Sequence, residues 1–351
     1  MRAFSNLKAS IANYKTLDSK DKKTFWKEGF INNLMYILII IAAIYTYTQN
    51  HKFLSVSSIV NIISLSAANI PIALGIAGCI VLTGTDLSAG RVVGLTACIS
   101  ASLLQSMDYA TKMFPNLQPL PIPVVILIVV VVGGIVGFVA QFKLHPFIVT
   151  LATQLITYGV LLLYIMINGN NGQPLSGLDN SFKNFVTGSL VKFFGVPIPN
   201  YVWYAIIMIA FMWFMWNKTT FGKNMFAVGS NPEAANVSGV SVFWTTIAVH
   251  TLAGAMYGIT GFIESARIGS NQANTGLNYE CDAIAACVIG GVSFVGGTGK
   301  ISGIVLGVFI LRIIFVALQF LSINQSMQYI IKGLIILVAC SIDMRKYLVR
   351  K

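Results

Sequence analysis

The stretch Val124-Val-Ile-Leu-Ile-Val-Val-Val-Val-Gly-Gly-Ile-Val-Gly-Phe-Val-Ala-Gln-Phe142 decides the fold class of this protein. It carries no charged side chain, and its one amide side chain lies near its end. At about 1.5 Å of rise per residue, a helix of this length spans the roughly 30 Å hydrocarbon core of a bilayer. The stretch therefore predicts a transmembrane helix.

The whole chain has the composition of a membrane protein. Of its 351 residues, 56% are hydrophobic and only 10% are charged, and the mean hydropathy is +0.77. A soluble domain does not need this balance to build one core. Ten apolar runs are candidate crossings, of which the eighth and tenth are short for a full span. They are Ile31–Tyr47, Ser58–Leu82, Leu87–Met107, Val124–Phe142, Pro146–Ile167, Tyr201–Trp216, Thr245–Ile263, Asp282–Val295, Ile301–Leu321 and Gln328–Ile342.

The positions of the positive charges predict the orientation. If all ten runs cross and the N-terminus is inside, most Lys and Arg residues fall on the inner side, as the positive-inside rule requires. The outer side then holds only Lys52, Lys112, Lys183, Lys192 and Arg267. An even number of crossings with both termini in the cytoplasm is favoured: ten, or eight if the short runs pair as re-entrant segments. The net charge of +12 then indicates membrane topology, and no nucleic-acid partner is expected.

This topology divides the chain into three parts. Residues 1–29 form a cytoplasmic N-terminal segment, residues 30–343 form an all-α polytopic bundle, and residues 344–351 form a basic cytoplasmic tail. The outer loop Asn168–Asn200, rich in Gly, Asn, Pro and Ser, is a candidate docking surface outside the membrane. Close helix packing is predicted by four Gly-x-x-x-Gly pairs. They are Gly90/Gly94, Gly133/Gly137, Gly254/Gly258 and Gly303/Gly307.

The inner loop Phe221–Gly239 carries a dense set of helix signals. Asparagine favours the N-cap, proline the first helical position and glutamate the positive end of the dipole, while alanines propagate a helix and glycine ends it. These signals stand in that order at Asn231, Pro232, Glu233, Ala234, Ala235 and Gly239. The sequence therefore predicts a short helix on the cytoplasmic face, of a kind that a groove in a neighbouring protein receives.

The order Glu-Ala-Ala-x-x-x-Gly in this loop resembles the ATPase-coupling loop of permease subunits of ATP-binding-cassette importers. The usual Ile and Leu-Pro further along are absent, since Ile247–Leu252 reads Ile-Ala-Val-His-Thr-Leu. In lacking these residues, the loop resembles the shortened loop of the subfamily of sugar and branched-chain amino-acid permeases. Four further segments extend the resemblance over nearly the whole chain from about residue 30. They are Gly84-Thr-Asp-Leu-Ser-Ala-Gly-Arg91, Pro146-Phe-Ile-Val-Thr-Leu-Ala-Thr153, Arg267-Ile-Gly-Ser270 and Asp282-Ala-Ile-Ala-Ala-Cys-Val-Ile-Gly-Gly-Val-Ser-Phe294.

The resemblance implies a multi-pass protein of the bacterial inner membrane. Its expected partners are a cytoplasmic ATP-binding protein that uses the ATP, a periplasmic sugar-binding protein and a second copy of the permease. No cofactor is expected on this chain itself. The substrate branch is indicated by Thr85, Ala89, Arg91, Phe221–Asn224 and Gln328–Gly333, which resemble the branch for galactose and methyl galactosides. Ribose, xylose and other monosaccharides remain alternatives.

Two groups of residues are candidates for the path of the solute. The first, which we call the inner-mouth motif, consists of Gly84, Asp86, Ser88, Gly90 and Arg91. Asp86 and Ser88 are expected to cap the third helix, and the motif is expected to act as a structural latch or a gate. Uncharged donors and acceptors on apolar helices exchange hydrogen bonds with sugar hydroxyls without trapping the solute. Such side chains are present at Asn69, Gln141, Thr153, Gln154 and Asn274. The alternative for each is a hydrogen bond between helices.

Charges inside the predicted helices provide a competing hypothesis. Arg312 and Lys332 lie deep enough to require a partner or a watery cavity. Near the outer edge, Glu264, Glu280 and Asp282 are candidate partners for Lys332 or Arg267. An ion-coupled secondary transporter would use Asp86, Glu264 and Arg312 as its coupling relay.

An enzyme is not expected. The histidines His51, His145 and His250 fall on separate loops or at different depths, and no paired-carboxylate or His-Glu-x-x-His motif accompanies them. Gly296-Gly-Thr-Gly-Lys300 lacks the first glycine of a phosphate-binding loop and has Ile301 where Ser or Thr would hold magnesium. The five cysteines show no Cys-x-x-Cys spacing, so no metal site is predicted.

Overall fold

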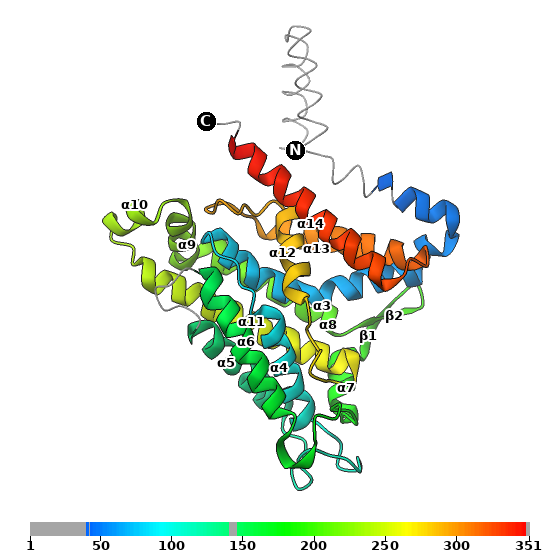
Figure 1. Cartoon of the computed structure of the whole chain (residues 1–351). Coiled ribbons are helices and arrows are strands. Elements are labelled where there is room, and N and C mark those ends of the chain that lie inside the picture. Colours follow the sequence, from blue (N-terminus) through cyan, green and yellow to red (C-terminus); the bar gives the residue numbers. More distant parts are fainter. Residues whose placement is uncertain (1–39, 42, 140–145, 349–351) are drawn as a thin grey trace.

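Helices form most of this computed structural model, which describes residues 40–41, 43–139 and 146–348 (Figure 1). The first half contains η1 (His51–Leu54), α3 (Val56–Val81), α4 (Ala89–Leu103), α5 (Ile122–Val139), α6 (Pro146–Tyr164), η2 (Ile167–Gly169), α7 (Asn180–Thr187), β1 (Ser189–Phe193) and β2 (Val196–Pro199). The second half contains α8 (Tyr201–Lys218), α9 (Thr220–Ser230), α10 (Pro232–Val237), α11 (Val242–Ile268), α12 (Tyr279–Ile289), α13 (Ile301–Phe320) and α14 (Gln325–Leu348).

Local signals explain where the two longest central helices begin and end. The Ser55 hydroxyl accepts a hydrogen bond from the Ser58 N–H at 3.2 Å at the start of α3. Ser241 caps α11 in the same way through the Trp244 N–H at 3.4 Å. Gly269 ends α11 with φ of +76°, a left-handed conformation that glycine adopts without a Cβ penalty.

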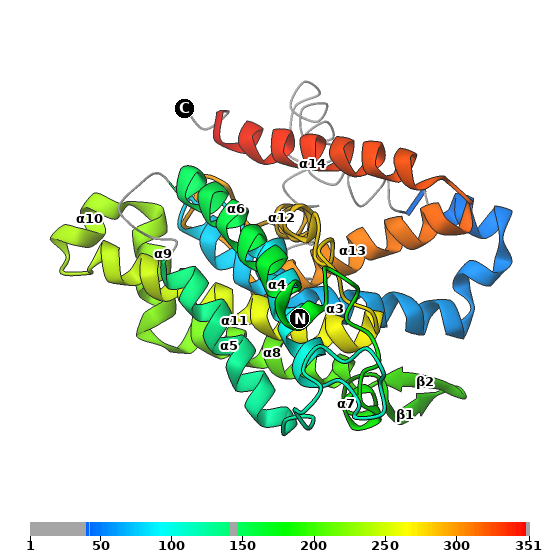
Figure 2. The same cartoon turned by 60° about the horizontal axis from the view of Figure 1, so that its bottom comes forward.

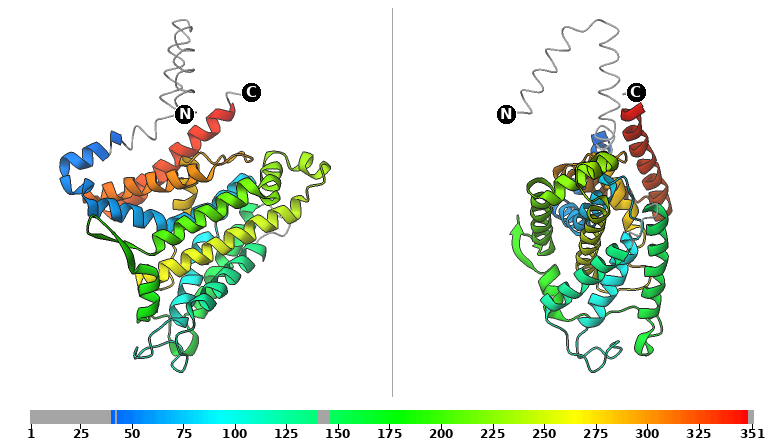
Figure 3. Two further views of the ribbon diagram at one scale, coloured as in Figure 1. Left: turned by 180° about the vertical axis from the view of Figure 1, so that it is seen from behind. Right: turned by 90° about the vertical axis from the view of Figure 1, so that its left-hand side faces the viewer.

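The molecule has two distinct ends, visible in Figures 1 and 3. Helices α9 and α10 lie at one end, which we call the α10 end. Helix α7 and the β1–β2 hairpin lie at the other, which we call the hairpin end. The hairpin pairs antiparallel, with Phe193 opposite Val196, and both intervening residues have positive φ. That combination is typical of a tight type I′ turn.

Helices α3 and α11 form the centre of the bundle (Figure 2). Helix α11 packs against α3, α4 and α5, while α12 packs against α3, α13 and α14. Every residue of α3 from Ser66 to Val81 is buried within the chain. The core is therefore built around helices that are apolar on all sides, as expected for central elements.

Glycines set the closest approach between helices, which confirms the predicted packing motifs. A Cβ on Gly254 would lie 2.1 Å from the Gly133 carbonyl oxygen, and one on Gly258 would lie 2.2 Å from that of Val129. The backbones of α5 and α11 therefore touch. The two other pairs also face neighbours, since Gly94 meets the Thr275 carbonyl and Gly307 meets that of Ala286 on α12.

The structure confirms some predicted spans and corrects others. Four described helices, α3, α6, α11 and α13, are long and apolar enough to cross a membrane. The expected third span is only the 15-residue α4, which at 1.5 Å per residue is about 22 Å long. The eighth is short as predicted, because α12 has 11 residues. The apolar part of the tenth is also short as predicted, because only Gln325–Val338 of the 24-residue α14 is apolar.

The segment preceding α12 explains the short span. Residues 269–278 form no helix and lie against α4, where a Cβ on Gly276 would be 2.2 Å from the Gly90 carbonyl oxygen. Within a membrane, non-helical backbone is tolerated where it is buried in protein or lines a water-filled cavity. Most of the first predicted span, together with residues 1–29, lies outside the described residues.

The loop Asn168–Asn200 is more ordered in structure than its composition suggested. It contains α7 and both strands, and α7 packs on α11 through Phe182 and Phe262, whose ring centroids are 5.0 Å apart. The missed signal was local: Asp179 caps the helix through the Ser181 N–H, and the buried Phe182 and Val186 stand four residues apart.

Candidate translocation and coupling sites

The predicted short helix at the α10 end is confirmed as α10. The Asn231 side-chain oxygen accepts a hydrogen bond from the Ala234 N–H at 2.9 Å, and Pro232 occupies the first turn. Gly239 follows with φ of +84° and donates its N–H to the Asn236 carbonyl at 3.0 Å. Asparagine therefore caps the N-terminus of the helix and glycine follows its C-terminus, as each residue type favours.

Helix α10 projects away from the rest of the chain (Figure 1). Only Ala235 is buried, while the other residues of the helix, Glu233 among them, are exposed. Val237 is 90% exposed, the highest value among the large hydrophobic side chains that the structure describes. A helix with one anchored face and an exposed apolar side chain is suited to docking in a groove of another protein.

The inner-mouth motif joins α3, α4 and α6. Asp86 is fully buried, and its Oδ1 accepts hydrogen bonds from the Ser88 N–H at 2.9 Å and hydroxyl at 2.6 Å. The prediction that Ser88 caps α4 is wrong: Ser88 stands at the N-cap, but its hydroxyl is donated to Asp86 and makes no cap bond. A Cβ on Gly84 would lie 3.3 Å from Pro146, at the start of α6.

Arg91 lies where three elements meet. Its guanidinium stacks over the Tyr158 ring of α6 at 4.0 Å from the centroid, a cation–π contact. Its Nη1 donates to the Ala273 carbonyl in the segment 269–278 at 3.3 Å. Its neighbour Gly90 lies so close to that segment that a Cβ would fall 2.5 Å from the Gly276 carbonyl. The motif therefore couples α4 to α6 and to the non-helical segment.

The predicted path residues are spread over three elements. On α3, the Asn69 side-chain N–H donates to the Leu65 carbonyl at 3.0 Å, while its buried oxygen has no hydrogen-bond partner among the described residues. On α6, Thr153 is buried and donates to the Val149 carbonyl at 2.8 Å, and Gln154 is half-buried. Asn274 is exposed on the segment 269–278. Gln141 lies outside the described residues.

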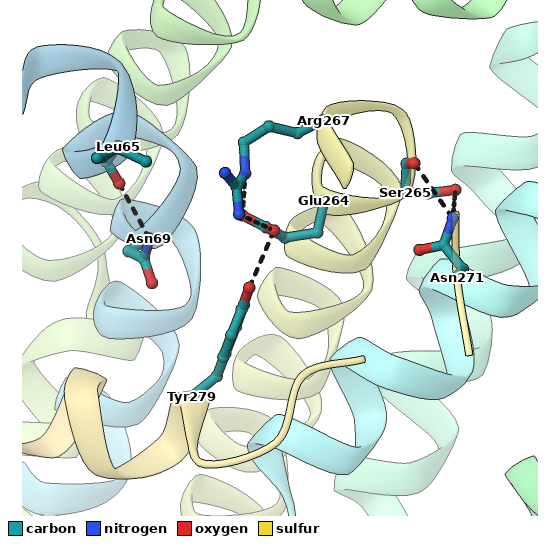
Figure 4. A network of polar contacts seen from close by, with 7 residues as sticks. All are labelled: Leu65, Asn69, Glu264, Ser265, Arg267, Asn271 and Tyr279. Carbon is teal, nitrogen blue, oxygen red and sulfur yellow. Dashed lines mark hydrogen bonds and ion pairs between the residues drawn. The ribbon is translucent and has the colours of Figure 1, made fainter. Parts of the chain in front are cut away.

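A buried charged cluster lies between α11 and α12, beside Asn69 in Figure 4. Arg267 donates to both oxygens of the fully buried Glu264, at 2.9 and 2.6 Å. The Tyr279 hydroxyl donates to the same carboxylate at 3.0 Å. The predicted pairing of Glu264 with Arg267 is thereby confirmed. Neither Tyr279 nor Asn271 was identified from the sequence. The Asn271 side chain donates to Ser265 at 3.2 Å.

A second charged cluster lies between α12, α13 and α14. Asp282 and Lys332 form an ion pair at 2.6 Å, as predicted. Arg312 lines a cavity of about 150 Å³ beside them, which agrees with the expectation that its charge needs a partner or a cavity. The lining consists of Asp282, Arg312, Phe315, Gln319, Gln325, Gln328, Tyr329 and Lys332. Gln319 and Gln325 were not identified from the sequence, because each stands near a helix end, where a polar side chain is ordinary. Gln328 was named only as part of the stretch that resembles the galactose branch.

The relay proposed for an ion-coupled transporter is not assembled. Glu264 pairs with Arg267, and Asp86 is bound by Ser88. Among the residues with described positions, no hydrogen bond joins Asp86, Glu264 and Arg312 to one another. Glu280 is buried beside Gly90, and it forms no ion pair within the described ranges.

Comparisons with known proteins agree on one family. Residues 58–340 match the family model described as branched-chain amino acid transport system / permease component. The galactose/methyl galactoside import permease protein MglC of Escherichia coli (strain K12) is 45% identical over 340 residues, which cover 95% of this chain and 99% of the relative. The protein of the same name from Haemophilus influenzae is 44% identical, covering 91% and 96%.

A ribose permease is a more distant relative. The ribose import permease protein RbsC of Escherichia coli (strain K12) is 31% identical over 316 residues, covering 90% of this chain and 93% of the relative. No solved structure matches the chain.

Proposed function

Because this chain belongs to the family of branched-chain amino acid transport system permease components, we propose that it is the membrane permease of an importer for galactose and methyl galactosides. The observation that carries this substrate class is the 45% identity to a galactose/methyl galactoside permease over 95% of the chain. The ribose permease, at 31%, supports the same kind of protein with a different sugar.

The proposed location is the bacterial inner membrane, with the α10 end in the cytoplasm and the hairpin end outside. The apolar helices α3, α6, α11 and α13 support a membrane position. The distribution of Lys and Arg along the chain supports this orientation, with ten crossings and both termini inside.

The proposed energy source is a separate ATP-binding protein docked on α10. The exposed Val237 and Glu233 supply an apolar anchor and a charge on a helix held by caps at each terminus. When ATP draws two such ATPase subunits together, each α10 moves with its subunit, and the bundle changes the side to which the path opens. This chain then supplies the moving path and binds no cofactor.

The proposed path lies between two copies of the permease, and a sugar-binding protein delivers the solute at the hairpin end. The exposed Asn274 and half-buried Gln154 lie on the segment 269–278 and on α6, two elements that Arg91 holds together. A second copy facing them would enclose hydrogen-bonding groups suited to sugar hydroxyls. The hairpin side chains Leu190 and Phe194, 81% and 82% exposed, supply an apolar surface for the binding protein.

Reconstituted transport tests this proposal. Proteoliposomes containing the permease, with and without its ATPase, binding protein and ATP, are assayed for radiolabelled galactose uptake without an ion gradient or membrane potential. We expect uptake only when all components and ATP are present. Uptake by the permease alone after a proton or sodium gradient is imposed would contradict the proposal and support a secondary transporter.

Val237→Asp is expected to uncouple transport from ATP. A charge at this exposed apolar anchor would be buried on docking, and losing a central interface contact commonly costs about 2 kcal/mol or more, so uptake should fall about thirtyfold or more. The amount of protein in the membrane should not change, because Val237 is 90% exposed. The measurement is ATP-driven galactose uptake normalised to permease content.

The conservative variant Val237→Leu is the matched control, since it keeps an apolar side chain at the same place. It should retain near-normal uptake. Equal uptake by the Asp variant and the wild type would count against α10 as the coupling element.

A further inference from the structure

We propose that the cavity between α12, α13 and α14 binds one monosaccharide as it enters the membrane, an inference that rests on the proposed import function. The cavity measures about 150 Å³, several times the roughly 30 Å³ that one water occupies in the liquid. It therefore has room for a small polyol rather than for isolated waters alone.

The cavity lies toward the hairpin end of the bundle. It is lined by the last two turns of α13 and the first two turns of α14. The end of α13 is fixed there by Phe320, whose ring meets Phe53 of η1 at 5.6 Å, and η1 precedes α3, against which β2 packs. A sugar released at the hairpin end would reach this cavity before the middle of the bundle.

The lining has the chemistry of a sugar site rather than of an ion site. Gln319 and Gln325 each offer two amide donors and a carbonyl acceptor, which match hydroxyl groups that both donate and accept. Gln328 already donates one amide N–H to the Ile323 carbonyl at 2.8 Å and offers its second N–H and its carbonyl oxygen. Ligand sites combine such polar groups with aromatic surface. Here Phe315 and Tyr329 supply it, with the Lys332 ammonium 5.0 and 5.4 Å from their ring centroids.

The charges in the cavity disfavour a cation. Asp282 is already paired with Lys332 at 2.6 Å, so the carboxylate is neutralised. Arg312 adds a further positive charge, and among the described residues it forms no ion pair. Neutral hydroxyl groups can accept from Arg312 and Lys332, whereas sodium or a proton would be repelled.

The transport test uses the complete complex in proteoliposomes. The double variant Gln319→Leu/Gln328→Leu keeps side-chain size but removes two hydrogen-bonding amides. Galactose molecules taken up per ATP hydrolysed should fall about tenfold, because two hydrogen bonds to the sugar are lost. Gln118→Leu is the matched control, because Gln118 is exposed in a loop outside the cavity, and it should leave the ratio unchanged.

The outcomes separate the two levels of the proposal. No galactose uptake by the wild-type complex would overturn the proposed function and this inference with it. Normal wild-type uptake with an unchanged ratio in the double variant, or an equal fall in the Gln118 control, would overturn the cavity site alone.

A labelling experiment keeps the inference testable if the double variant misfolds. Full-length Gln325→Cys permease in proteoliposomes is treated with a membrane-impermeant thiol reagent, and the wild type gives the background from its own cysteines. Galactose should slow modification of Cys at this position severalfold, while the acyclic polyol mannitol should not. Equal rates with galactose, mannitol and buffer would overturn the proposed site.

Discussion

Replacing Gly254 by leucine should prevent α5 and α11 from packing and lower the free energy of unfolding by about 3 kcal/mol or more. Even a Cβ at this position would lie 2.1 Å from the Gly133 carbonyl oxygen and 2.8 Å from its carbon. The obstacle is backbone, so no side-chain rotation relieves it. The two helices would have to separate along their whole contact, which includes Gly137 and Gly258.

The measurement is the thermal unfolding midpoint of purified permease in mild detergent, together with the fraction that elutes as a single species. Gly159→Leu is the matched control, because Gly159 lies in α6 with no atom within 4 Å of a built Cβ. Leucine there should be neutral or stabilise the helix by about 0.5–1 kcal/mol. An unchanged midpoint for Gly254→Leu would mean that α5 and α11 do not touch as described.

The existence of this contact was predictable, but not its partners. Gly-x-x-x-Gly at Gly133/Gly137 and Gly254/Gly258 indicates that each helix approaches some backbone closely. Nothing in either motif states that the two approach one another, because any other glycine-bearing helix would satisfy both. Only the three-dimensional arrangement resolves which surfaces meet.

Features governed by neighbours in sequence were predicted best. The cap, first turn and end of α10 depend on Asn231, Pro232 and Gly239 alone, and all three occupy the expected positions. The rule failed at Ser88, because the adjacent Asp86 carboxylate competes for the same hydroxyl. Helix α7 was missed because its apolar pattern, Phe182 and Val186, is too short to stand out in a polar loop.

Sites assembled from distant segments were predicted only where charge forced a choice. A partly buried Lys332 inside an apolar helix needs a carboxylate, so Asp282 was among a few candidates. No such constraint pointed to Gln319 or Gln328, because a neutral amide near a helix end has several satisfactory environments. The cavity they line therefore became apparent only from the packing of α12, α13 and α14.

Glu264→Gln should be the most destabilising change to a single polar side chain in the bundle. It removes the carboxylate that accepts from Arg267 at 2.9 and 2.6 Å and from Tyr279 at 3.0 Å. Leaving the partner of a buried ion pair uncompensated costs about 3–5 kcal/mol. We expect the lower end of that range, because the Arg267 side chain retains 27% exposure while that of Glu264 has none.

A double variant without either charge separates the effect of the ion pair from that of general packing. Glu264→Leu/Arg267→Met removes both charges and keeps apolar volume, and such replacements are often neutral or stabilising. The double variant should therefore unfold at a higher temperature in mild detergent than Glu264→Gln, although it carries more substitutions. Tyr279→Phe, which removes one hydrogen bond, should cost only about 1 kcal/mol. If the double variant were no more stable than Glu264→Gln, the cost would arise from lost packing around α11, and the buried arginine would not be its cause.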